Sequence, residues 1–380
     1  MTDKEHSAPA ENLQHPENND LYKGLKVNKG IADVPMINPY LKRVRRKELT
    51  VDDYVKGILD GNITLLSRAV TLIESQLASH QEMAQQIIEK CLPYSGNSMR
   101  IGITGVPGAG KSTSIDTLGM HIIKQGRKLA VLAIDPSSEV SGGSILGDKT
   151  RMEQLSREKN AFIRPSPSAG SLGGVARKTR ETIVLCEAAG FDTIFVETVG
   201  VGQSETAVHS MVDFFLLIQL AGTGDELQGI KRGIMEMADG IIINKADGDN
   251  VQKAQLAASH YRNALRLFPK AESGWNPKVL CYSGYYGIGI KEIWDMLDAY
   301  RHHAIDSGYF TEKRLKQTKW WMKETIEDAL RDSFYHNTDV MNLLPEIEDH
   351  ILNDRMTPFT AATALIDKYF SWIRQNTNQG

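Results

Sequence analysis

The sequence contains little cysteine, and its few cysteines suggest no covalent framework. Only three occur in 380 residues, Cys91, Cys186 and Cys281, and they lie far apart. They form no C-x-x-C pair, and an odd number is a poor basis for a set of disulfides. We therefore expect reduced, buried thiols in a reducing cytosol rather than a redox or metal site.

A long apolar run is also missing. A helix that spans a bilayer needs about 20 apolar residues, and the longest uncharged apolar run, residues 214–221, is only long enough for a strand. Residues 1–20 are charged and polar and lack the apolar centre of a secretory signal. These absences predict a soluble, cytoplasmic protein that does not bind a membrane.

An excess of one charge is absent as well. Lys and Arg number 44 against 47 Asp and Glu, which gives a formal net charge of −3. A chain so close to neutral gives no support for a nucleic-acid clamp or a polybasic membrane anchor. We therefore expect no nucleic-acid partner.

The pattern of apolar residues divides the chain into four stretches: residues 1–45, 46–95, 96–302 and 303–380. The first carries no period and is expected to be mostly disordered. The second and the fourth show helical periodicity. In the second, Thr50 with Asp53 resembles an acidic variant of a capping box, and Asn62 is placed to cap another helix.

Short apolar runs in the third stretch predict the strands of a sheet. They lie at residues 100–104, 129–134, 193–197, 214–220, 240–244 and 278–282. Most are continuously apolar, as expected of parallel strands that are buried on both faces. Helical patterns alternate with them, at residues 111–125, 251–267 and 290–300. This alternation predicts a doubly wound α/β domain with a mostly parallel sheet, flanked by helical segments, whose ligands bind at the carboxyl ends of the strands.

A phosphate-binding loop follows the first expected strand. Residues 105–112 fit G-x-x-x-x-G-K-[ST] at each defined position. Glycine lets successive N–H groups turn toward phosphate oxygens, and the start of the next helix adds a favourable dipole. Lys111 is expected to reach the β- and γ-phosphates, and the Ser112 hydroxyl to bind Mg²⁺. The predicted phosphate-binding residues are Gly105, Val106, Pro107, Gly108, Ala109, Gly110, Lys111, Ser112 and Thr113.

A second motif selects the base. Asn244, Lys245 and Asp247 follow an expected strand and match N-K-x-D. The Asp247 carboxylate can accept hydrogen bonds from N1–H and the 2-amino group of guanine. Adenine offers neither donor there, so we expect strong rejection of ATP. Ser283 and Gly284, after the last strand, are candidates for a loop that contacts the guanine carbonyl, and an ordinary turn explains them equally well.

Two acidic residues at strand ends are candidates for the metal. Asp135 ends the second expected strand, and Glu197 begins Glu-Thr-Val-Gly in the place of the common D-x-x-G switch motif. Either carboxylate can hold Mg²⁺ directly or through water; the alternative for each is a solvated acid at a strand end. The Gly200 N–H is placed to sense the γ-phosphate, which predicts a nucleotide-dependent loop at residues 199–204.

No group is obviously placed to activate water. Ras-like enzymes carry Gln directly after D-x-x-G, but Val201 stands there and Gln203 follows two residues later. Arg177 and Lys231 are candidates for a built-in cationic finger, with a solvated surface charge as the alternative for each. We therefore expect slow intrinsic hydrolysis that rises when a partner completes the site. The candidate catalytic residues are Lys111, Asp135, Glu197, Gln203 and Lys231.

With these residues in view, the chain resembles the MeaB/ArgK (MMAA-type) family of GTPases. The most distinctive stretches are residues 105–112, 135–138, 141–148, 197–205 and 224–231. The resemblance implies a SIMIBI-type P-loop fold and a homodimer, with residues 96–302 as the GTPase domain and residues 303–380 as a dimerisation arm. It also implies a chaperone that gates cofactor loading of an adenosylcobalamin-dependent acyl-CoA mutase, usually methylmalonyl-CoA mutase, and protects that enzyme from inactivation.

The same resemblance assigns further residues. It places Asp135, Asp148 and Glu197 in the metal and switch region, and makes residues 225–231 a third switch loop that transmits the nucleotide state to the mutase. The chain has no Asp-x-His-x-x-Gly cobalamin signature, which suits a helper that does not hold the cofactor.

Two other functions stay open. One is a GTPase that serves a different acyl-CoA mutase. The other is a nickel-insertion GTPase, which would be expected to cluster Cys or His ligands. The ten histidines of this chain are scattered apart from His302 and His303.

One apolar stripe in the fourth stretch has two interpretations. It lies on roughly one face of the expected helix and comprises Trp320, Trp321, Thr325, Ile326 and Leu330. The stripe can form the seam of a dimer, or it can pack against the chain's own GTPase domain.

Overall fold

The computed structural model of the protein describes residues 49–135, 152–167, 172–198, 204–221 and 232–377. The extension predicted for residues 1–45 lies outside them. At the start of the described chain, the Thr50 side chain accepts from the Asp53 N–H while the Asp53 carboxylate accepts from the Thr50 N–H, which confirms the capping box. The Asn62 side chain caps the next helix by accepting from Thr64 and Leu65 N–H groups, also as predicted.

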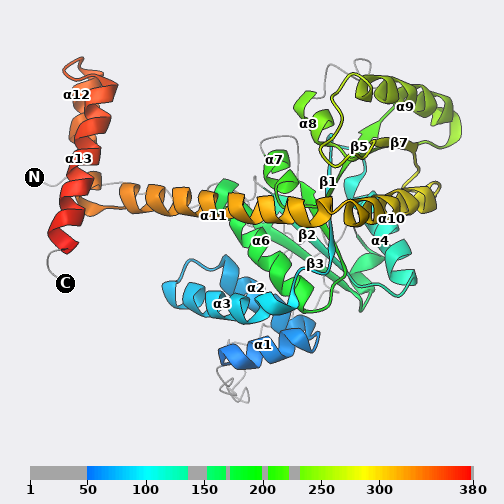
Figure 1. Ribbon diagram of the computed structural model, residues 1–380, viewed down its shortest axis with the longest axis horizontal. Helices are drawn as coiled ribbons and strands as arrows, with labels where there is room; N and C mark the ends of the chain where they lie inside the picture. Colours follow the sequence, from blue (N-terminus) through cyan, green and yellow to red (C-terminus); the bar gives the residue numbers. More distant parts are fainter. Residues whose placement is uncertain (1–48, 136–151, 168–171, 199–203, 222–231, 378–380) are drawn as a thin grey trace, which may run out of the picture. The chain divides into compact units, whose positions relative to one another are not determined.

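The centre of the described chain is a seven-stranded sheet in which all the paired neighbours are parallel. The strand order is β3-β2-β4-β1-β5-β6-β7 (Figure 1). The strands are β1 (Met99–Gly105), β2 (Leu129–Asp135), β3 (Ala161–Pro167), β4 (Thr193–Thr198), β5 (Phe214–Leu220), β6 (Gly240–Asn244) and β7 (Lys278–Cys281). The six strands predicted from apolar runs are all present, and the α/β class is confirmed.

Strand β3 was not predicted, and its sequence explains why. It contains Arg164, Pro165 and Pro167, which are unusual in a strand. β3 is at the edge of the sheet, and Leu129 N donates to Asn160 O at its start. In a parallel ladder every second residue bonds the same neighbour, so both prolines fall at positions whose N–H would point away from β2. The missing N–H groups therefore break no bond within the sheet.

Helices cover both faces of the sheet (Figure 1). On one face, α4 (Lys111–Lys124) and α10 (Ile290–Asp306) bury Ile115, Leu118 and Leu297 against the strands. On the other lie α6 (Leu172–Ala188), α7 (Ser204–His209), α8 (Arg232–Met237) and α9 (Val251–Leu265). The helices α1 (Val51–Leu59), α2 (Ile63–Glu74) and α3 (Ala78–Cys91) pack against one another and against α6.

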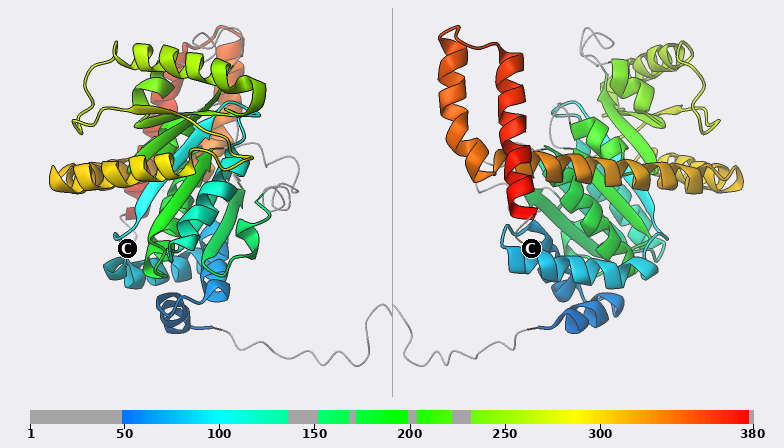
Figure 2. Two further views of the ribbon diagram at one scale, coloured as in Figure 1. Left: turned by 90° about the vertical axis from the view of Figure 1, so that its right-hand side faces the viewer. Right: turned by 60° about the vertical axis from the view of Figure 1, so that its left-hand side comes forward.

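The remaining helices are C-terminal: α11 (Tyr309–Tyr335), α12 (Thr338–Leu352) and α13 (Pro358–Thr377). α12 and α13 pack side by side around Val340, Ile347 and Leu365 (Figure 2). Phe334, near the end of α11, joins the same small core. This part of the chain is helical, as predicted.

A buried cluster of charges, Arg100, Glu187, Asp213 and Arg314, fixes the first turns of α11 to the sheet. Arg314 donates to Asp213 from Nε at 2.9 Å and from Nη2 at 2.7 Å, and also to the carbonyls of Gly96 and Ser98. Arg100 makes a two-pronged contact with Glu187. Burial alone would raise the pKa of Asp213, but Arg314 and Arg100 hold it below its usual value.

Candidate nucleotide-binding site

The parallel sheet brings the predicted site residues to one edge. Gly105 ends β1, Asp135 ends β2, Asn244 ends β6, and Glu197 is next to the last residue of β4. The Thr198 hydroxyl donates to the Thr104 hydroxyl at 2.9 Å, which ties the ends of β4 and β1 together. The carboxyl ends of parallel strands share one edge, so residues from four strands converge on the start of α4.

Glycine is required in the loop between β1 and α4. Gly108 and Gly110 have φ angles of 77° and 84°, which non-glycine residues rarely adopt. A Cβ atom on Gly110 would also lie 2.5 Å from Asn244 Nδ2, and one on Gly105 would lie 2.2 Å from Ile218 O. The loop can therefore approach its neighbours only because these residues lack side chains. We call residues 105–110 the phosphate loop.

Lys111 is the first residue of α4 and lies among acidic groups. Its Nζ donates to Gly105 O at 2.9 Å. Burial lowers the pKa of Lys111, and the carboxylates of Glu197 and Glu205 oppose that shift. Glu205 lies in α7 and is 2% exposed. The sequence did not predict that Glu205 lies near Lys111, because the spatial neighbours of a single acidic residue cannot be read from the sequence. The available signal was that Glu205 belongs to the distinctive stretch 197–205.

Ser112 and Glu197 form the described part of the predicted metal site. The Ser112 hydroxyl donates to Glu197 Oε1 at 3.4 Å, and Glu197 is 4% exposed. A hydroxyl and a carboxylate are the hard oxygen donors that Mg²⁺ prefers, so the pair fits this metal. The backbone of Asp135 lies at the end of β2, but its side chain and all of Asp148 lie outside the described residues.

The N-K-x-D motif joins two loops. Asn244 Nδ2 donates to Ala109 O at 2.7 Å, while its Oδ1 accepts from the Lys245 N–H at 2.8 Å and the Gly284 N–H at 3.0 Å. The Ser283 hydroxyl donates to Asp247 Oδ2 at 2.5 Å. Ser283 and Gly284 are both buried, and the Ser283 hydroxyl and the Gly284 N–H hold them against the motif. We call these two residues the guanine loop, after the role proposed for them from the sequence.

Most of the candidates for activating water fall outside the described residues. Gln203, Lys231 and the loop residues 199–203 lie outside the described part of the chain. Arg177 lies on α6, where its Nε pairs with Glu181 at 2.9 Å and its side chain is 53% exposed. This pairing of residues four apart on a helix surface is the solvated alternative that the sequence left open for Arg177.

The cysteines are free thiols, as expected. Cys91 and Cys186 are buried and Cys281 is half-buried. Burial raises the pKa of Cys91 to about 11, so its thiol stays protonated. Among the described residues, no group of three or more His, Cys, Asp or Glu side chains is arranged to hold a metal ion. Within the same ranges, no helix has the length and apolar content needed to cross a membrane.

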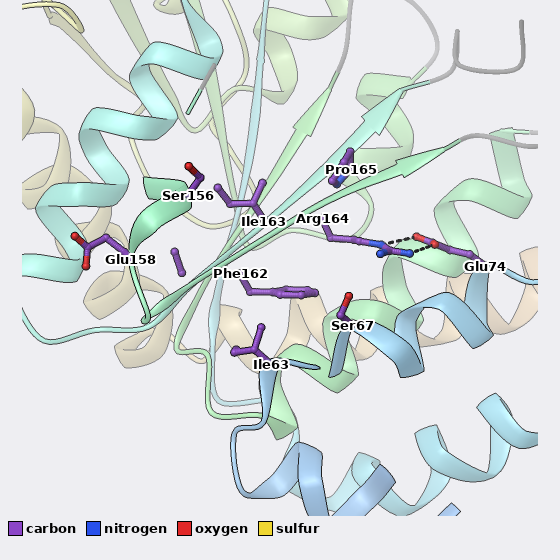
Figure 3. Close-up of a pocket in the computed structure, with 10 residues that line it drawn as sticks. Ile63, Ser67, Glu74, Ser156, Glu158, Phe162, Ile163, Arg164 and Pro165 are labelled. Carbon is purple, nitrogen blue, oxygen red and sulfur yellow. Dashed lines mark hydrogen bonds and ion pairs between the residues drawn. The ribbon is translucent and has the colours of Figure 1, made fainter. Parts of the chain in front are cut away.

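A separate cavity of about 380 Å³ lies beside the edge strand (Figure 3). Ile63 and Glu74 of α2 and Phe162 and Arg164 of β3 line it, and Arg164 pairs with Glu74 at its side. None of the predicted nucleotide residues lines this cavity. It is therefore distinct from the edge where the phosphate and guanine loops meet.

Comparison with known proteins shows which family the chain belongs to. Residues 66–339 match the family model described as methylmalonyl Co-A mutase-associated GTPase MeaB. The chain belongs to the MeaB family. A probable GTPase of Mycobacterium tuberculosis is 49% identical over 318 residues, covering 84% of this chain and 95% of the relative. The GTPase ArgK of Escherichia coli is 43% identical over 318 residues, covering 84% and 96% of the two chains.

Two further relatives extend this result. The mouse mitochondrial methylmalonic aciduria type A homolog is 43% identical over 336 residues, covering 86% of this chain and 81% of the relative. The crystal structure of a LAO/AO transport system kinase superimposes with a TM-score of 0.68 at 36% identity, covering 83% of this chain and 96% of that one. The MeaB model and the relatives named as GTPases show that this MeaB-family protein is a GTP-hydrolysing enzyme that binds guanine nucleotides.

Proposed function

We propose that this MeaB-family GTPase is a chaperone of an adenosylcobalamin-dependent methylmalonyl-CoA mutase, which it loads with cofactor and protects from inactivation. The observation that carries the proposal is the match to a family described by its association with that mutase. The name of the mouse relative, which refers to methylmalonic aciduria, points the same way. On this proposal the protein acts in the cytoplasm, as its sequence predicts.

The residues at the sheet edge take distinct roles in this proposal. Lys111 neutralises charge on the β- and γ-phosphates. To do so, its Nζ gives up the hydrogen bond to Gly105 O and donates to a phosphate oxygen instead. Asp247, oriented by Ser283, reads the guanine N1–H and 2-amino group. Ser112 and Glu197, with Asp135 and Asp148, would hold Mg²⁺, which screens phosphate charge when it is bound. Gln203 and Lys231 remain candidates for the groups that complete the site.

We also propose a homodimer formed through the C-terminal helices. Met322, Ile326 and Leu330 lie four residues apart on α11, and they are 58%, 50% and 61% exposed. Residues at this spacing share one helix face, and so large an apolar stripe is typical of an interaction surface. A second copy of α11 would bury it.

The two interpretations of the tryptophan stripe apply to different residues. Trp321 Nε1 donates to Ser210 O at 3.1 Å, and Arg180 lies over both Trp320 and Trp321. These rings therefore pack against the chain's own GTPase domain. Ile326 and Leu330, one and two turns further on, are the exposed part that we assign to the dimer.

The test is GTP hydrolysis by the purified protein, alone and with methylmalonyl-CoA mutase from the same source. We expect a slow basal rate that rises sharply with the mutase. Lys111→Ala should abolish both rates, and ATP in place of GTP should give neither. A rate that the mutase leaves unchanged would contradict the assigned client, and the same assay with other acyl-CoA mutases would then identify it.

A further inference from the structure

A single hydroxyl links the phosphate-binding helix α4 to the guanine loop. Thr117 lies in the second turn of α4 and is half-buried. Its Oγ1 lies 2.9 Å from Gly284 O and 2.8 Å from Thr113 O, in donor geometry to both. A hydroxyl carries one proton, so the two carbonyls share it. Thr117 thus divides its hydrogen bond between its own helix and a loop 167 residues away in the sequence.

The contact fixes Gly284 from two sides. The Gly284 N–H donates to Asn244 Oδ1 at 3.0 Å, and its carbonyl accepts from Thr117. Asn244 is in turn hydrogen-bonded to Ala109 of the phosphate loop. Both polar groups of the Gly284 backbone are therefore held by residues that belong to, or contact, the phosphate-binding part of the site.

The neighbouring hydroxyls do not make this link. Ser114 Oγ and Tyr282 OH are buried in the same region, and neither reaches hydrogen-bond geometry with a described residue. The Ser114 and Thr117 hydroxyls nevertheless lie close enough to the phenol to oppose the rise that burial causes in the pKa of Tyr282. The Tyr282 ring is 1% exposed and lies beneath Gly284, where a Cβ atom would come within 3.3 Å of the phenol oxygen. Of these three side chains, Thr117 is the one that is hydrogen-bonded to the guanine loop.

We propose that Thr117 is a positioning residue for base recognition. Thr117 holds Gly284 O and thereby fixes the position of the neighbouring Ser283, whose hydroxyl bonds Asp247. The orientation of the Asp247 carboxylate toward the 2-amino group of guanine therefore depends on Thr117. The inference rests on the proposed assignment of Asp247 and Ser283 to guanine. The competing role is local, since a threonine in a helix often bonds the carbonyl four residues before it.

Comparing GDP with IDP separates the two roles. Hypoxanthine lacks the 2-amino group, so IDP gains less from a well-placed Asp247 than GDP does. If Thr117 positions the guanine loop, its loss weakens GDP binding more than IDP binding. If Thr117 only supports α4, which carries the phosphate-binding residues, both nucleotides lose affinity by the same factor.

The experiment measures both dissociation constants by calorimetry for the full chain and three variants. Thr117→Val removes the hydroxyl at nearly constant volume, and we expect its Kd for GDP to rise about 3- to 10-fold, as for one lost hydrogen bond, with a smaller rise for IDP. Thr117→Ser keeps the hydroxyl and should restore both values. Ser114→Ala removes a buried hydroxyl of the same helix that makes no hydrogen bond to Gly284, and it should bind GDP as the wild type does.

Two results would overturn the inference: an unchanged GDP affinity in Thr117→Val, or an equal loss for GDP and IDP. A Ser114→Ala variant as weak as Thr117→Val would do the same, because the loss of any buried hydroxyl on α4 would then weaken GDP binding. Failure of the guanine assignment itself would look different. In that case the wild-type protein would not prefer GDP to ADP.

Discussion

The side-chain amide of Asn244 connects the phosphate loop with the guanine loop. Nδ2 donates to Ala109 O at 2.7 Å, and Oδ1 accepts from the Gly284 N–H at 3.0 Å. One rigid amide makes both contacts, so the two loops keep a fixed spacing only while this side chain stays in place. A substitution that crowds Asn244 should therefore weaken nucleotide binding.

Gly110→Ala is expected to weaken GDP binding much more than Gly108→Ala. Both glycines have positive φ angles, 84° and 77°, so each alanine costs about 1–2 kcal/mol of backbone strain. Only at Gly110 would the new Cβ meet Asn244, 2.5 Å from Nδ2, while no atom of the described chain lies within 4 Å of one on Gly108. Losing the two Asn244 contacts should increase the Kd about 10-fold further. Calorimetric titration of both variants tests this, and equal effects would contradict the role of Asn244.

Asp247→Asn should change the base preference from guanine toward xanthine. A carboxamide offers one acceptor and one donor, which match N1–H and the 2-oxo group of xanthine, whereas the carboxylate offers two acceptors. The amide oxygen can still accept from Ser283, so the loop should be preserved. GDP and XDP affinities measured on the variant check this. Asp249→Asn, at an exposed position two residues later, is the matched control and should keep the preference for GDP.

Arg314→Ala should destabilise the fold by about 3–5 kcal/mol, because it leaves Asp213 buried without its strongest partner. Urea unfolding monitored by circular dichroism measures the change. The control is Arg355→Ala, whose ion pair with Asp349 is long, at 3.9 Å, and exposed; its effect should stay within about 0.5 kcal/mol. Similar losses in the two variants would show that burial of the charge cluster does not matter.

His209 is expected to make the protein less stable in acid. Burial, with a contribution from nearby Lys313, lowers the pKa of His209 from 6.5 to about 4, and its ring packs edge-on against Phe215. Between these pH values the unfolded chain binds the proton and the folded one does not, so stability falls as the pH drops from 6.5 to 4.

Each pH unit in this window should remove up to about 1.4 kcal/mol of unfolding free energy. His209→Gln lacks the titrating group, so its stability should depend less on pH over this range. Urea unfolding of both proteins at several pH values measures the difference. Parallel curves for the two proteins would show that His209 does not titrate as its burial implies.

Leu330→Glu on α11 should convert the proposed dimer to a monomer. It places a charge at one end of the exposed stripe with Met322 and Ile326, where a partner helix would have to desolvate it. Light scattering after size exclusion gives the mass directly. Arg331→Glu changes charge at an exposed position of α11 that faces away from the stripe, and it serves as the control. A wild-type protein that is already monomeric would contradict the proposed dimer.

Sequence reasoning reached the site because its motifs are local. The phosphate loop and the N-K-x-D motif each carry their chemistry within a few consecutive residues, and each follows an apolar strand that is easy to recognise. Glu205 could not be given a role in this way, since its effect on Lys111 depends on where α7 lies. Thr117 was missed for the same reason, because its partner Gly284 comes from the other end of the domain.

The fold shows the same division between local and long-range information. Continuous apolar runs marked six strands, whereas β3 was hidden by Arg164 and its prolines. Trp321 and Ile326 belong to one stripe in the sequence, yet only the packing of α11 reveals that the first is covered by its own domain and the second is not.

The prolines of β3 also limit how copies of this protein can associate. An exposed strand at the edge of a sheet is a template on which further strands can add, and that growth leads to fibrils. Pro165 and Pro167 have no N–H group, so β3 lacks two of the hydrogen-bond donors that an incoming strand would need along this edge. This edge of the sheet is therefore a poor template for backbone pairing between copies, whereas the strand at the other edge, β7, contains no proline.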